Sequence, residues 1–361
     1  MLLGLVAGVL AGLSSWVFLI TLDWAITTRE DRAGWLVWLL PVASFGIVAI
    51  YHHFGGRSAG GTTMVIDAAR AEPAAGRTDV APEHRVPRRL AVFVTVGCVL
   101  GHLFGASVGR EGTALQSSGS LGETAARVLR LDPWWRRELL VASIAGGFGA
   151  VFGVPFAGTV FALEVCCRIP GATWRERWSV RAVLAAPAAA AAFSGDLVVR
   201  LLGHHHTSYR DVAPAFGLGI AVRFVLAGLA LGAAGWLYLA SVRSVRRVLR
   251  PLGYPPLRAG AVGALVVLGA VLAGRQYLSL SVPLAVAATS NVAVAASAWL
   301  WKLMFTAVSV GGGLPGGEIT PLFVTGALAG AALGRLLGVP VVLLASIGFA
   351  AVFGAAARAP A

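Results

Sequence analysis

Two short polar stretches hold the residues of this chain that could carry out chemistry. The first has the sequence GREGT at 109–113, and the second has the sequence GGEITP at 316–321. Each places a Glu and a Thr two residues apart beside glycines, and the sequence around both is almost wholly apolar. The two stretches share a register, because one constant spacing separates the members of four pairs: Glu111 and Glu318, Thr113 and Thr320, Leu115 and Leu322, Gly119 and Gly326. An ionisable residue in apolar surroundings marks a functional site by default, and its recurrence in two halves indicates a transporter built from an internal repeat.

The residue types of both stretches suit the binding of a small anion. A helix N-terminus offers backbone N–H groups and the positive end of the helix dipole, so it binds anions without a cation. Glycine before the helix lets the backbone approach the ion closely. We therefore expect anion contacts from Gly112 and Thr113 in the first stretch and from Gly317, Ile319 and Thr320 in the second. If the two helix ends meet at the bilayer midplane, one anion would lie between them.

The two glutamates would link the anion to protons. An ionised Glu111 would occupy the anion position at its helix end, whereas the neutral acid could swing away, so this residue is the predicted gate. Neutral Glu318 would donate a hydrogen bond to the bound anion and so bring anion and proton together. The structural alternative is that each glutamate pairs with an arginine, with Arg110 as the candidate partner of Glu111. For the glycines, the alternative is close packing between helices.

A third stretch, Gly60–Met64, precedes a short apolar segment that ends at Asp67. It is a candidate helix start along the same path, in which Thr62 or Thr63 would act as a hydrogen-bond donor. An ordinary loop explains this stretch equally well.

The overall composition is that of a helical membrane protein. Hydrophobic residues make up 57% of the 361 positions and charged residues 12%, with a mean hydropathy of +0.80. Soluble proteins carry about 25% charged residues. Uncharged runs long enough to span a bilayer as a helix recur at Met1–Leu22, Gly34–Gly56 and Leu278–Trp301. The first run has no basic flank before it, so we predict a membrane helix and not a secretory signal.

The charge pattern favours a lipid bilayer over nucleic acid as the partner. The net charge is +13 and the pI about 11.1, and Lys302 is the only lysine. The arginines gather in short stretches between apolar blocks, several of them beside tryptophans, which is typical of loops at a membrane surface. These stretches are Arg85–Arg89, Arg127–Arg137, Arg175–Arg181 and Arg243–Arg250.

Neither the cysteines nor the histidines form a metal-binding or catalytic pattern. Cys98, Cys166 and Cys167 lie in or beside apolar segments without metal or disulfide spacing, so we expect small buried residues. The histidines at 52–53 and 204–206 lie where apolar blocks end, where we expect solvated imidazoles, and they lack a His-Glu-x-x-His arrangement. A membrane-embedded enzyme would need a nucleophile or a metal constellation. We therefore expect no enzymatic activity, no metal and no cofactor.

Two repeat halves, 1–203 and 204–361, are predicted within a single transmembrane domain. Gly147–Gly153 matches Gly348–Gly354 at six of seven positions, and only the first copy continues through Pro155 into another helix. The second half is therefore expected to be incomplete, with the chain truncated at its C-terminus. Many apolar segments are short or broken by Gly and Pro, which indicates re-entrant helices near a binding site.

Taken in order, these motifs resemble those of the CLC family of anion channels and proton-coupled antiporters. GREGT at 109–113 is similar to the family's GREGP, GGEITP at 316–321 occupies the place of GxFxP, and AGGTTM at 59–64 lies where the family has GSGIP. The resemblance covers essentially the whole chain up to Ala361. It implies an all-α, polytopic membrane fold with an inverted internal repeat and many short, re-entrant helices. It also implies a homodimer with one pore per subunit, in the inner (plasma) membrane of a bacterium.

Departures from these motifs resemble the fluoride-type branch of the family, whose members exchange fluoride for protons. Glu318 stands at a position of GxFxP that is usually apolar, and Thr113 replaces the Pro of GREGP. The resemblance implies that Glu111 is the gating glutamate and that Glu318 and Thr320 bind the central anion. It also implies an inner gate near Thr62, Thr63 and Met64.

One further position separates the fluoride branch from the chloride branch. Chloride-type antiporters usually carry an inner proton-transfer Glu directly after the Glu of the FALE stretch, and here Val165 follows Glu164. Family members also place a Tyr from a late helix at the anion, which nothing here matches. We expect a fluoride/proton antiporter that exports fluoride. The alternative is a chloride/proton antiporter or a passive chloride channel of the same fold.

Overall fold

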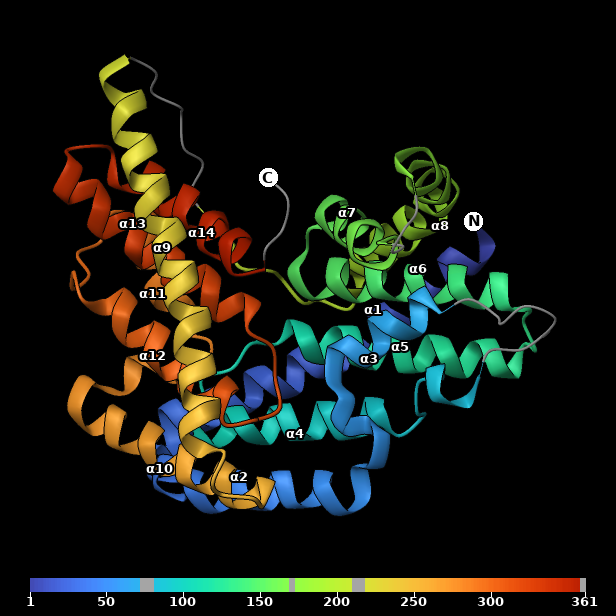
Figure 1. The fold of residues 1–361 in the computed structure, drawn as a ribbon, viewed down its shortest axis with the longest axis horizontal. Coiled ribbons are helices and arrows are strands. Elements are labelled where there is room, and N and C mark those ends of the chain that lie inside the picture. Colours follow the sequence, from blue (N-terminus) through green and yellow to red (C-terminus); the bar gives the residue numbers. More distant parts are fainter. Residues whose placement is uncertain (72–80, 169–172, 210–217, 358–361) are drawn as a thin grey trace. The chain divides into compact units, whose positions relative to one another are not determined.

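The computed structural model describes residues 1–361 except 72–80, 169–172, 210–217 and 358–361. Across these described ranges the chain forms α-helices joined by turns and short 3-10 or π-helical segments, without any β-strand (Figure 1). The predicted all-α fold with many short helices is therefore confirmed. Most of the long loop expected between Ala71 and Arg89 lies outside the described residues, and its later part contains a 3-10 turn at Pro82–His84.

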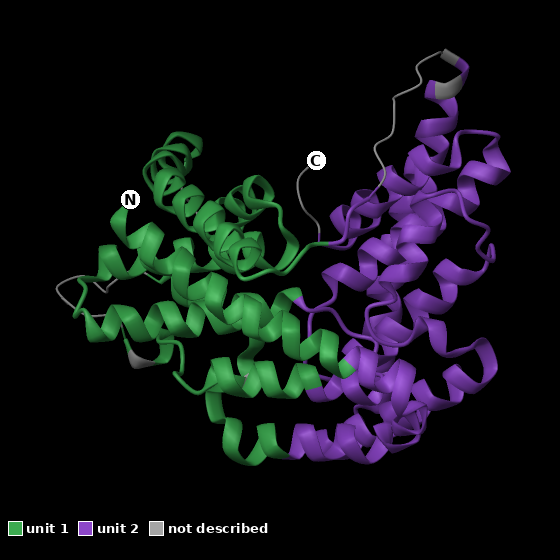
Figure 2. Ribbon diagram, turned by 180° about the vertical axis from the view of Figure 1, so that it is seen from behind, with its two compact units in different colours: residues 1–25, 50–99, 111–206 green, residues 26–49, 100–110, 207–361 purple. Residues whose placement is uncertain are grey.

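The chain divides into two compact units, which are described separately here (Figure 2). Unit 1 consists of residues 1–25, 50–99 and 111–206, and unit 2 consists of residues 26–49, 100–110 and 207–361. Two short early segments therefore pack with the later part of the chain. The predicted repeat halves, 1–203 and 204–361, describe a symmetry relation between sequences and stay a prediction.

Unit 1 contains residues 111–113 of the first predicted site stretch, whose first two residues belong to unit 2. Its helices are α1 (Leu2–Thr27, whose last two residues belong to unit 2), α3 (Gly61–Arg70), α4 (Leu90–Phe104, up to residue 99), α5 (Glu111–Val128), α6 (Pro133–Phe152), α7 (Pro155–Cys166) and α8 (Trp174–Leu201). Small residues let α1 and α8 pack closely. A Cβ atom on Gly8 would lie 2.5 Å from the carbonyl oxygen of Ala191, and one on Gly12 would lie 2.8 Å from that of Gly195. Such small-residue faces are typical of helices that associate in a membrane.

Unit 2 contains the second predicted site stretch. Its helices are α2 (Leu40–Ile50, whose last residue belongs to unit 1), α9 (Leu218–Leu249), α10 (Pro255–Ala273), α11 (Val282–Thr289), α12 (Ala298–Gly311), α13 (Ile319–Leu337) and α14 (Val341–Ala357). Glycines again bring two helices together, because Gly326 of α13 faces the backbone of Gly348 in α14. Any side chain at either glycine would collide with the opposing backbone.

Proline, glycine and a capping box set several helix boundaries in unit 1. Pro133 and Pro155 occupy the first positions of α6 and α7, where a missing N–H costs no hydrogen bond. Gly153 ends α6 in the left-handed conformation with φ 71°. Thr173 and Glu176 form a capping box at the start of α8, in which the Thr173 hydroxyl accepts from the Glu176 N–H at 3.3 Å.

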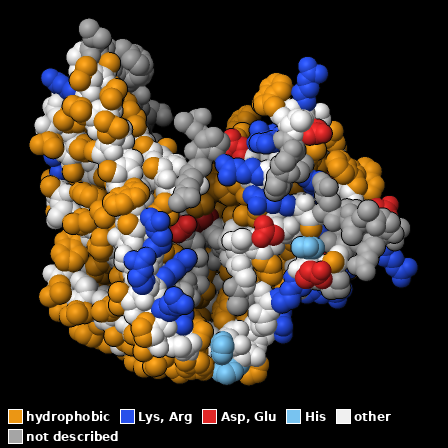
Figure 3. Space-filling model, viewed as in Figure 1, with side chains coloured by type: hydrophobic (Ala, Val, Ile, Leu, Met, Phe, Trp, Pro, Cys, Tyr) orange, Lys and Arg blue, Asp and Glu red, His pale blue; other side chains and the backbone are white. Residues whose placement is uncertain are grey.

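The described residues contain six helical segments that are long and apolar enough to cross a membrane. They are Leu2–Arg32, Gly34–Arg70, Trp174–Leu201, Ala221–Leu249, Pro255–Ala273 and Ile319–Leu337. The first contains the predicted run Met1–Leu22 except for Met1, and the second contains the predicted run Gly34–Gly56. Hydrophobic side chains cover much of the visible face of unit 2, and basic side chains gather over the C-terminal part of α9 (Figure 3). That surface suits contact with lipid.

The third predicted spanning run, Leu278–Trp301, is wrong as a single helix. The short helix α11 ends at Thr289, and α12 starts only at Ala298. Ser281 and Asn291 adopt φ values of 57° and 60°, which no continuous right-handed helix allows. Composition alone did not reveal this break, because the connecting residues are uncharged.

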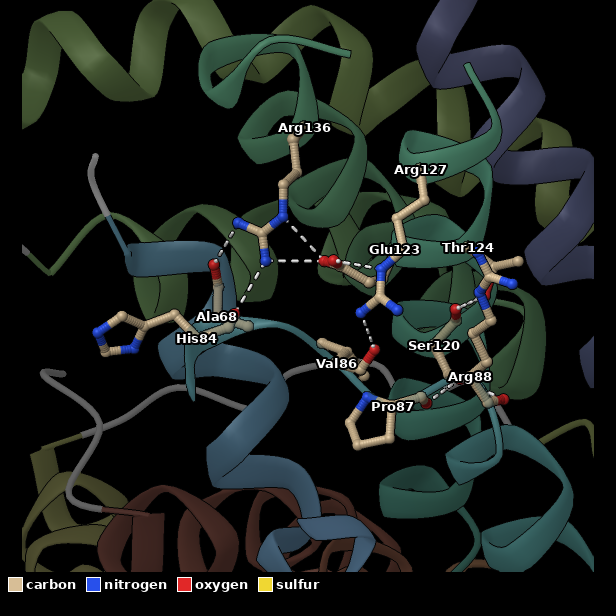
Figure 4. A network of polar contacts seen from close by, with 10 residues as sticks. All are labelled: Ala68, His84, Val86, Pro87, Arg88, Ser120, Glu123, Thr124, Arg127 and Arg136. Atoms are coloured by element: carbon tan, nitrogen blue, oxygen red, sulfur yellow. Dashed lines mark hydrogen bonds and ion pairs between the residues drawn. The ribbon is translucent and has the colours of Figure 1, made fainter. Parts of the chain in front are cut away.

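A buried ion-pair network holds the far end of α5 (Figure 4). The fully buried carboxylate of Glu123 accepts hydrogen bonds from Arg127 Nε at 3.1 Å and from Arg136 Nε at 2.9 Å. The two guanidinium groups also donate to carbonyl oxygens of the preceding segment, at 2.8 Å for Val86 and 2.9 Å for His84. Breaking one partner of such a pair would leave an uncompensated buried charge.

Two arginines of α6 are buried, although the sequence predicted them at the membrane surface. The Arg127–Arg137 stretch was expected at the membrane surface, but Arg136 and Arg137 are each only 5% exposed, inside α6. Their burial is possible where a carboxylate and backbone carbonyls satisfy the guanidinium, as they do for Arg136. The network thereby ties α5, α6 and the segment at 84–88 together within unit 1.

Candidate functional site

Residues 111–113 of the first predicted site stretch form the start of α5 in unit 1. α5 begins at Glu111, which is 1% exposed, and the following Gly112 and Thr113 are also buried. Cys98 of α4 lies beside Thr113 and Glu111. The first backbone N–H groups of a helix have no partner within the helix, so this end can donate to an anion or to a carboxylate. The helix start predicted from the sequence is therefore present, with its glutamate shielded from solvent.

The second predicted site stretch lies at the start of α13 in unit 2. Glu318 directly precedes α13, which begins at Ile319, and Thr320 is 5% exposed in the first turn. Glu318 itself is exposed, and its Oε2 accepts a hydrogen bond of 2.6 Å from the hydroxyl of Tyr238 in α9. Tyr238 is fully buried. The structure thus gives Glu318 a tyrosine partner, which differs from the arginine partner weighed as an alternative.

Tyr238 is a candidate functional residue that the sequence analysis missed. It lies 80 positions before Glu318, in a long apolar stretch that resembles any other membrane helix. The one available signal was a single phenolic hydroxyl in that stretch, because a buried Tyr hydroxyl usually has a hydrogen-bond partner. No local pattern identified Glu318 as that partner.

A backbone pair joins Gly109 of the first stretch to Gly317 of the second, ahead of the glutamate in each. Within unit 2, the Gly109 N–H donates to the Gly317 carbonyl oxygen at 2.5 Å, and the Gly317 N–H donates to the Gly109 carbonyl oxygen at 2.8 Å. Gly316 has a φ of 147°, and a Cβ atom there would lie 2.5 Å from the Val108 side chain. Glycine at 316 is therefore required for this close approach. Along the chain, the pair lies one residue before Glu318 and two residues before Glu111.

The third predicted stretch begins α3 in unit 1. The hydroxyl of Thr62 accepts a hydrogen bond of 3.2 Å from Nε2 of Gln116, so this stretch contacts α5 shortly after Glu111. Thr63 is exposed and Met64 is half-buried. Gly60–Met64 therefore belongs to the start of a helix and not to an ordinary loop.

Unit 1 also contains the position that separates chloride-type antiporters from the fluoride branch. Glu164 is half-buried near the end of α7, and Val165 follows it. The carbonyl oxygen of Val165 accepts two hydrogen bonds from Arg70, at 2.9 Å from Nε and 2.6 Å from the terminal nitrogen. Residue 165 therefore accepts hydrogen bonds from Arg70 through its backbone carbonyl, and its side chain is not a carboxylate.

In the part of the chain that the structure describes, no group of three or more His, Cys, Asp or Glu residues could hold a metal ion. All three cysteines are buried and free of disulfides, as predicted. The expectation of solvated imidazoles is wrong for His204 and His206, whose side chains are 13% and 11% exposed. The His204 ring lies 3.7 Å from the Asp23 carboxylate, and the His206 ring lies 3.5 Å from the Asp196 carboxylate.

Known proteins are similar to this chain in sequence. The family model described as voltage gated chloride channel matches residues 47–361. A chloride/fluoride channel protein of Pseudomonas syringae pv. tomato is 39% identical over 369 residues, covering 99% of this chain and 76% of the relative. An H(+)/Cl(-) exchange transporter of Yersinia pseudotuberculosis is 24% identical over 400 residues, covering 100% of this chain and 77% of the relative.

Solved structures show the same fold. The crystal structure of a CLC-type fluoride/proton antiporter matches with a TM-score of 0.86 and 30% identity, covering 98% of this chain and 85% of the other. A slow cyanobacterial Cl-/H+ antiporter matches with a TM-score of 0.79 and 16% identity, covering 99% and 85%. The second match, at 16% identity, speaks for the fold alone.

Proposed function

Because the chain belongs to the voltage-gated chloride channel (CLC) family of membrane proteins, we propose that it is a fluoride/proton antiporter that exports fluoride. The observation that carries the proposal is the carboxyl group of Glu318 at the start of α13, held by Tyr238. The names of two relatives support the choice of ion, since one is a chloride/fluoride channel protein and the other a CLC-type fluoride/proton antiporter.

The proposed mechanism assigns different proton chemistry to the two glutamates. When Glu318 is the neutral acid, Tyr238 donates to Oε2, so the acid proton resides on Oε1 and can be donated to fluoride. Fluoride is a small, hard acceptor, and a carboxylic acid is a strong hydrogen-bond donor for it. Glu111 acts as the gate: its carboxylate competes with the anion for the N-terminus of α5, and protonation removes that competition.

The wider proposal follows from the family. The protein would work as a transporter and not as an enzyme, as a homodimer in the inner (plasma) membrane of a bacterium. Its ligands would be fluoride and protons, with lipid around it, and it would need neither a cofactor nor a metal. Thr113 with the start of α5, and Thr320 with the start of α13, would each supply further donors to an anion.

The test is a coupled flux measurement on the purified protein. Liposomes containing the protein are loaded with fluoride, and fluoride efflux and external pH are followed together with electrodes. We expect proton movement into the liposomes in a fixed ratio to fluoride efflux, and uphill fluoride movement when only a pH gradient is imposed. Chloride-loaded liposomes serve as the comparison. Chloride flux at the fluoride rate would favour the chloride alternative, and fluoride efflux without proton movement would reject antiport.

A further inference from the structure

The chain's only lysine is buried in unit 2, outside the site described above. Lys302 lies in α12 and is 0% exposed. Its Nζ donates to Ser107 Oγ at 3.0 Å, to the Tyr277 carbonyl oxygen at 3.1 Å and to the Ser279 carbonyl oxygen at 2.6 Å. An ammonium group has three N–H donors, and each of them has an acceptor here. A buried cation in apolar surroundings is costly, so these contacts require an explanation beyond packing.

One of the three partners of Lys302, Ser107, also contacts two other residues of α12. The Ser107 N–H donates to Ser309 Oγ at 3.2 Å, and the Ser107 hydroxyl contacts Thr306 Oγ1 at 3.2 Å. Lys302, Thr306 and Ser309 are spaced by four and three residues, so they lie on one face of the helix. Both the backbone and the side chain of Ser107 are thus attached to α12.

Ser107 belongs to the segment that leads into the first site stretch. Two residues later, Gly109 forms its backbone pair with Gly317. Between them, the Val108 carbonyl oxygen lies 3.2 Å from Nε2 of the buried His102. The backbone from 107 to 109 is therefore attached at each residue, and α5 begins at Glu111, two residues after Gly109.

We propose that Lys302 is a positioning residue for the gating glutamate, acting through Ser107. The three contacts of α12 with Ser107 hold the backbone at 107–109, and from there the chain continues through Arg110 to Glu111. This inference rests on the proposed function, because it assigns Lys302 an effect on proton coupling. The structural alternative is that Lys302 only stabilises the turn at 277–279. Its amino group donates to the carbonyl oxygens of Tyr277 and Ser279, and Ser279 has a φ of 57°.

The test uses variants that remove the contacts around Ser107 in different combinations. Ser107→Ala removes the contacts of its hydroxyl with Lys302 and Thr306 and also the hydrogen bond of 3.2 Å that this hydroxyl donates to the Tyr277 carbonyl oxygen. Ser107→Ala and Thr306→Val each remove a single hydroxyl and keep Lys302, whereas Lys302→Met removes its amino group. Thr289→Val is the matched control, because the buried Thr289 hydroxyl donates only within its own helix, to the Ala285 carbonyl oxygen at 2.9 Å. Each purified variant is checked for helicity and thermal stability, and the ratio of protons to fluoride is then measured in liposomes.

We expect the proton-to-fluoride ratio to fall at least about twofold for Ser107→Ala and Lys302→Met, while Thr289→Val retains the wild-type ratio. The double variant Lys302→Met/Ser107→Ala should be no worse than Lys302→Met alone, because both changes break the same connection. Folded Ser107→Ala and Thr306→Val proteins with the wild-type ratio would overturn the inference, even if Lys302→Met fails to fold. Loss of stability in Lys302→Met without any change of ratio would also overturn it.

The failure of this inference differs from the failure of the proposed function. Wild-type protein without coupled fluoride flux would reject the proposed function. If the wild type moves chloride with protons, the same variants are compared by their proton-to-chloride ratio. Normal wild-type coupling with unaffected Ser107 and Lys302 variants would reject only the positioning role.

Discussion

The starts of α5 and α13 share a Glu and Thr pattern in the sequence, but they lie in different surroundings. Glu111 is buried as the first residue of α5, whereas Glu318 is exposed just before α13 and bonded to Tyr238. A buried carboxylate must satisfy its charge within the protein or take up a proton. An exposed one with a fixed partner can face an arriving ion. The same motif is thus suited to two different tasks.

The two helices are also held in place by different means. The far end of α5 is fixed by the charges of Glu123, Arg127 and Arg136, whereas α13 is fixed by glycine contacts with α14. Gly119 and Gly326, which correspond in the two stretches, have different neighbours: Gly119 faces the side chain of Val65, and Gly326 faces the backbone of Gly348. Equivalence in sequence register therefore does not extend to equivalent packing.

The largest expected effect is the loss of proton transport on substitution of Glu111, which tests whether Glu111 and Glu318 have different roles. Glu111→Gln cannot take up or release a proton, so we expect proton transport to fall by about 100-fold or more, in line with the loss of a positioned proton-transfer group. The measurement is proton flux driven by a fluoride gradient in liposomes. Glu164→Gln, in the same unit, serves as the control and should leave coupling unchanged. Coupled transport that survives Glu111→Gln would exclude the gate assignment.

Removing the second carboxyl group should change ion preference more than proton movement. Glu318→Gln keeps a hydrogen-bond donor but loses the acid proton, so we expect the fluoride-to-chloride flux ratio to fall about tenfold, close to the value of one charge-assisted hydrogen bond. The ratio is measured with matched fluoride and chloride gradients. If Glu318→Gln abolished proton transport as fully as Glu111→Gln, the two starts would have equivalent roles and the comparison would fail.

The backbone pair between Gly109 and Gly317 can be tested through Gly316. Gly316→Ala introduces a Cβ atom 2.5 Å from Val108 at a φ of 147°, so we expect a loss of about 1–3 kcal/mol in the free energy of unfolding. Gly313→Ala is the control, because Gly313 also has a positive φ, 85°, but nothing lies within 4 Å of its Cβ position. Thermal unfolding in detergent compares the two. Equal losses would mean that backbone strain alone, and not the contact with Val108, matters.

The smallest expected effect concerns the partner of Glu318. Tyr238→Phe removes one hydrogen bond and little volume, so we expect fluoride efflux to slow about fivefold, in line with about 1 kcal/mol for a single bond. Tyr254→Phe, on a half-exposed ring that contacts Phe45, is the control. An unchanged efflux rate in Tyr238→Phe would show that Glu318 needs no fixed orientation.

The sequence by itself determined the class of protein and the local features of the site. Long apolar runs predicted membrane helices, and glycine next to Glu and Thr predicted the helix starts at 111 and 319. These signals are local, because apolar length, helix dipoles and glycine's freedom each act within a few residues along the chain. The motif resemblance to CLC proteins depended on the same local residues, and the family match bears it out.

Only the tertiary structure decided which distant residues meet. The bond from Tyr238 to Glu318, the pair of Gly109 with Gly317 and the contact of Lys302 with Ser107 each join residues far apart in sequence. The break within Leu278–Trp301 and the burial of Arg136 likewise depend on partners that the folded chain supplies. A hydrogen-bond donor or a charge in a sequence shows that a partner is needed, but its identity follows from how the helices pack.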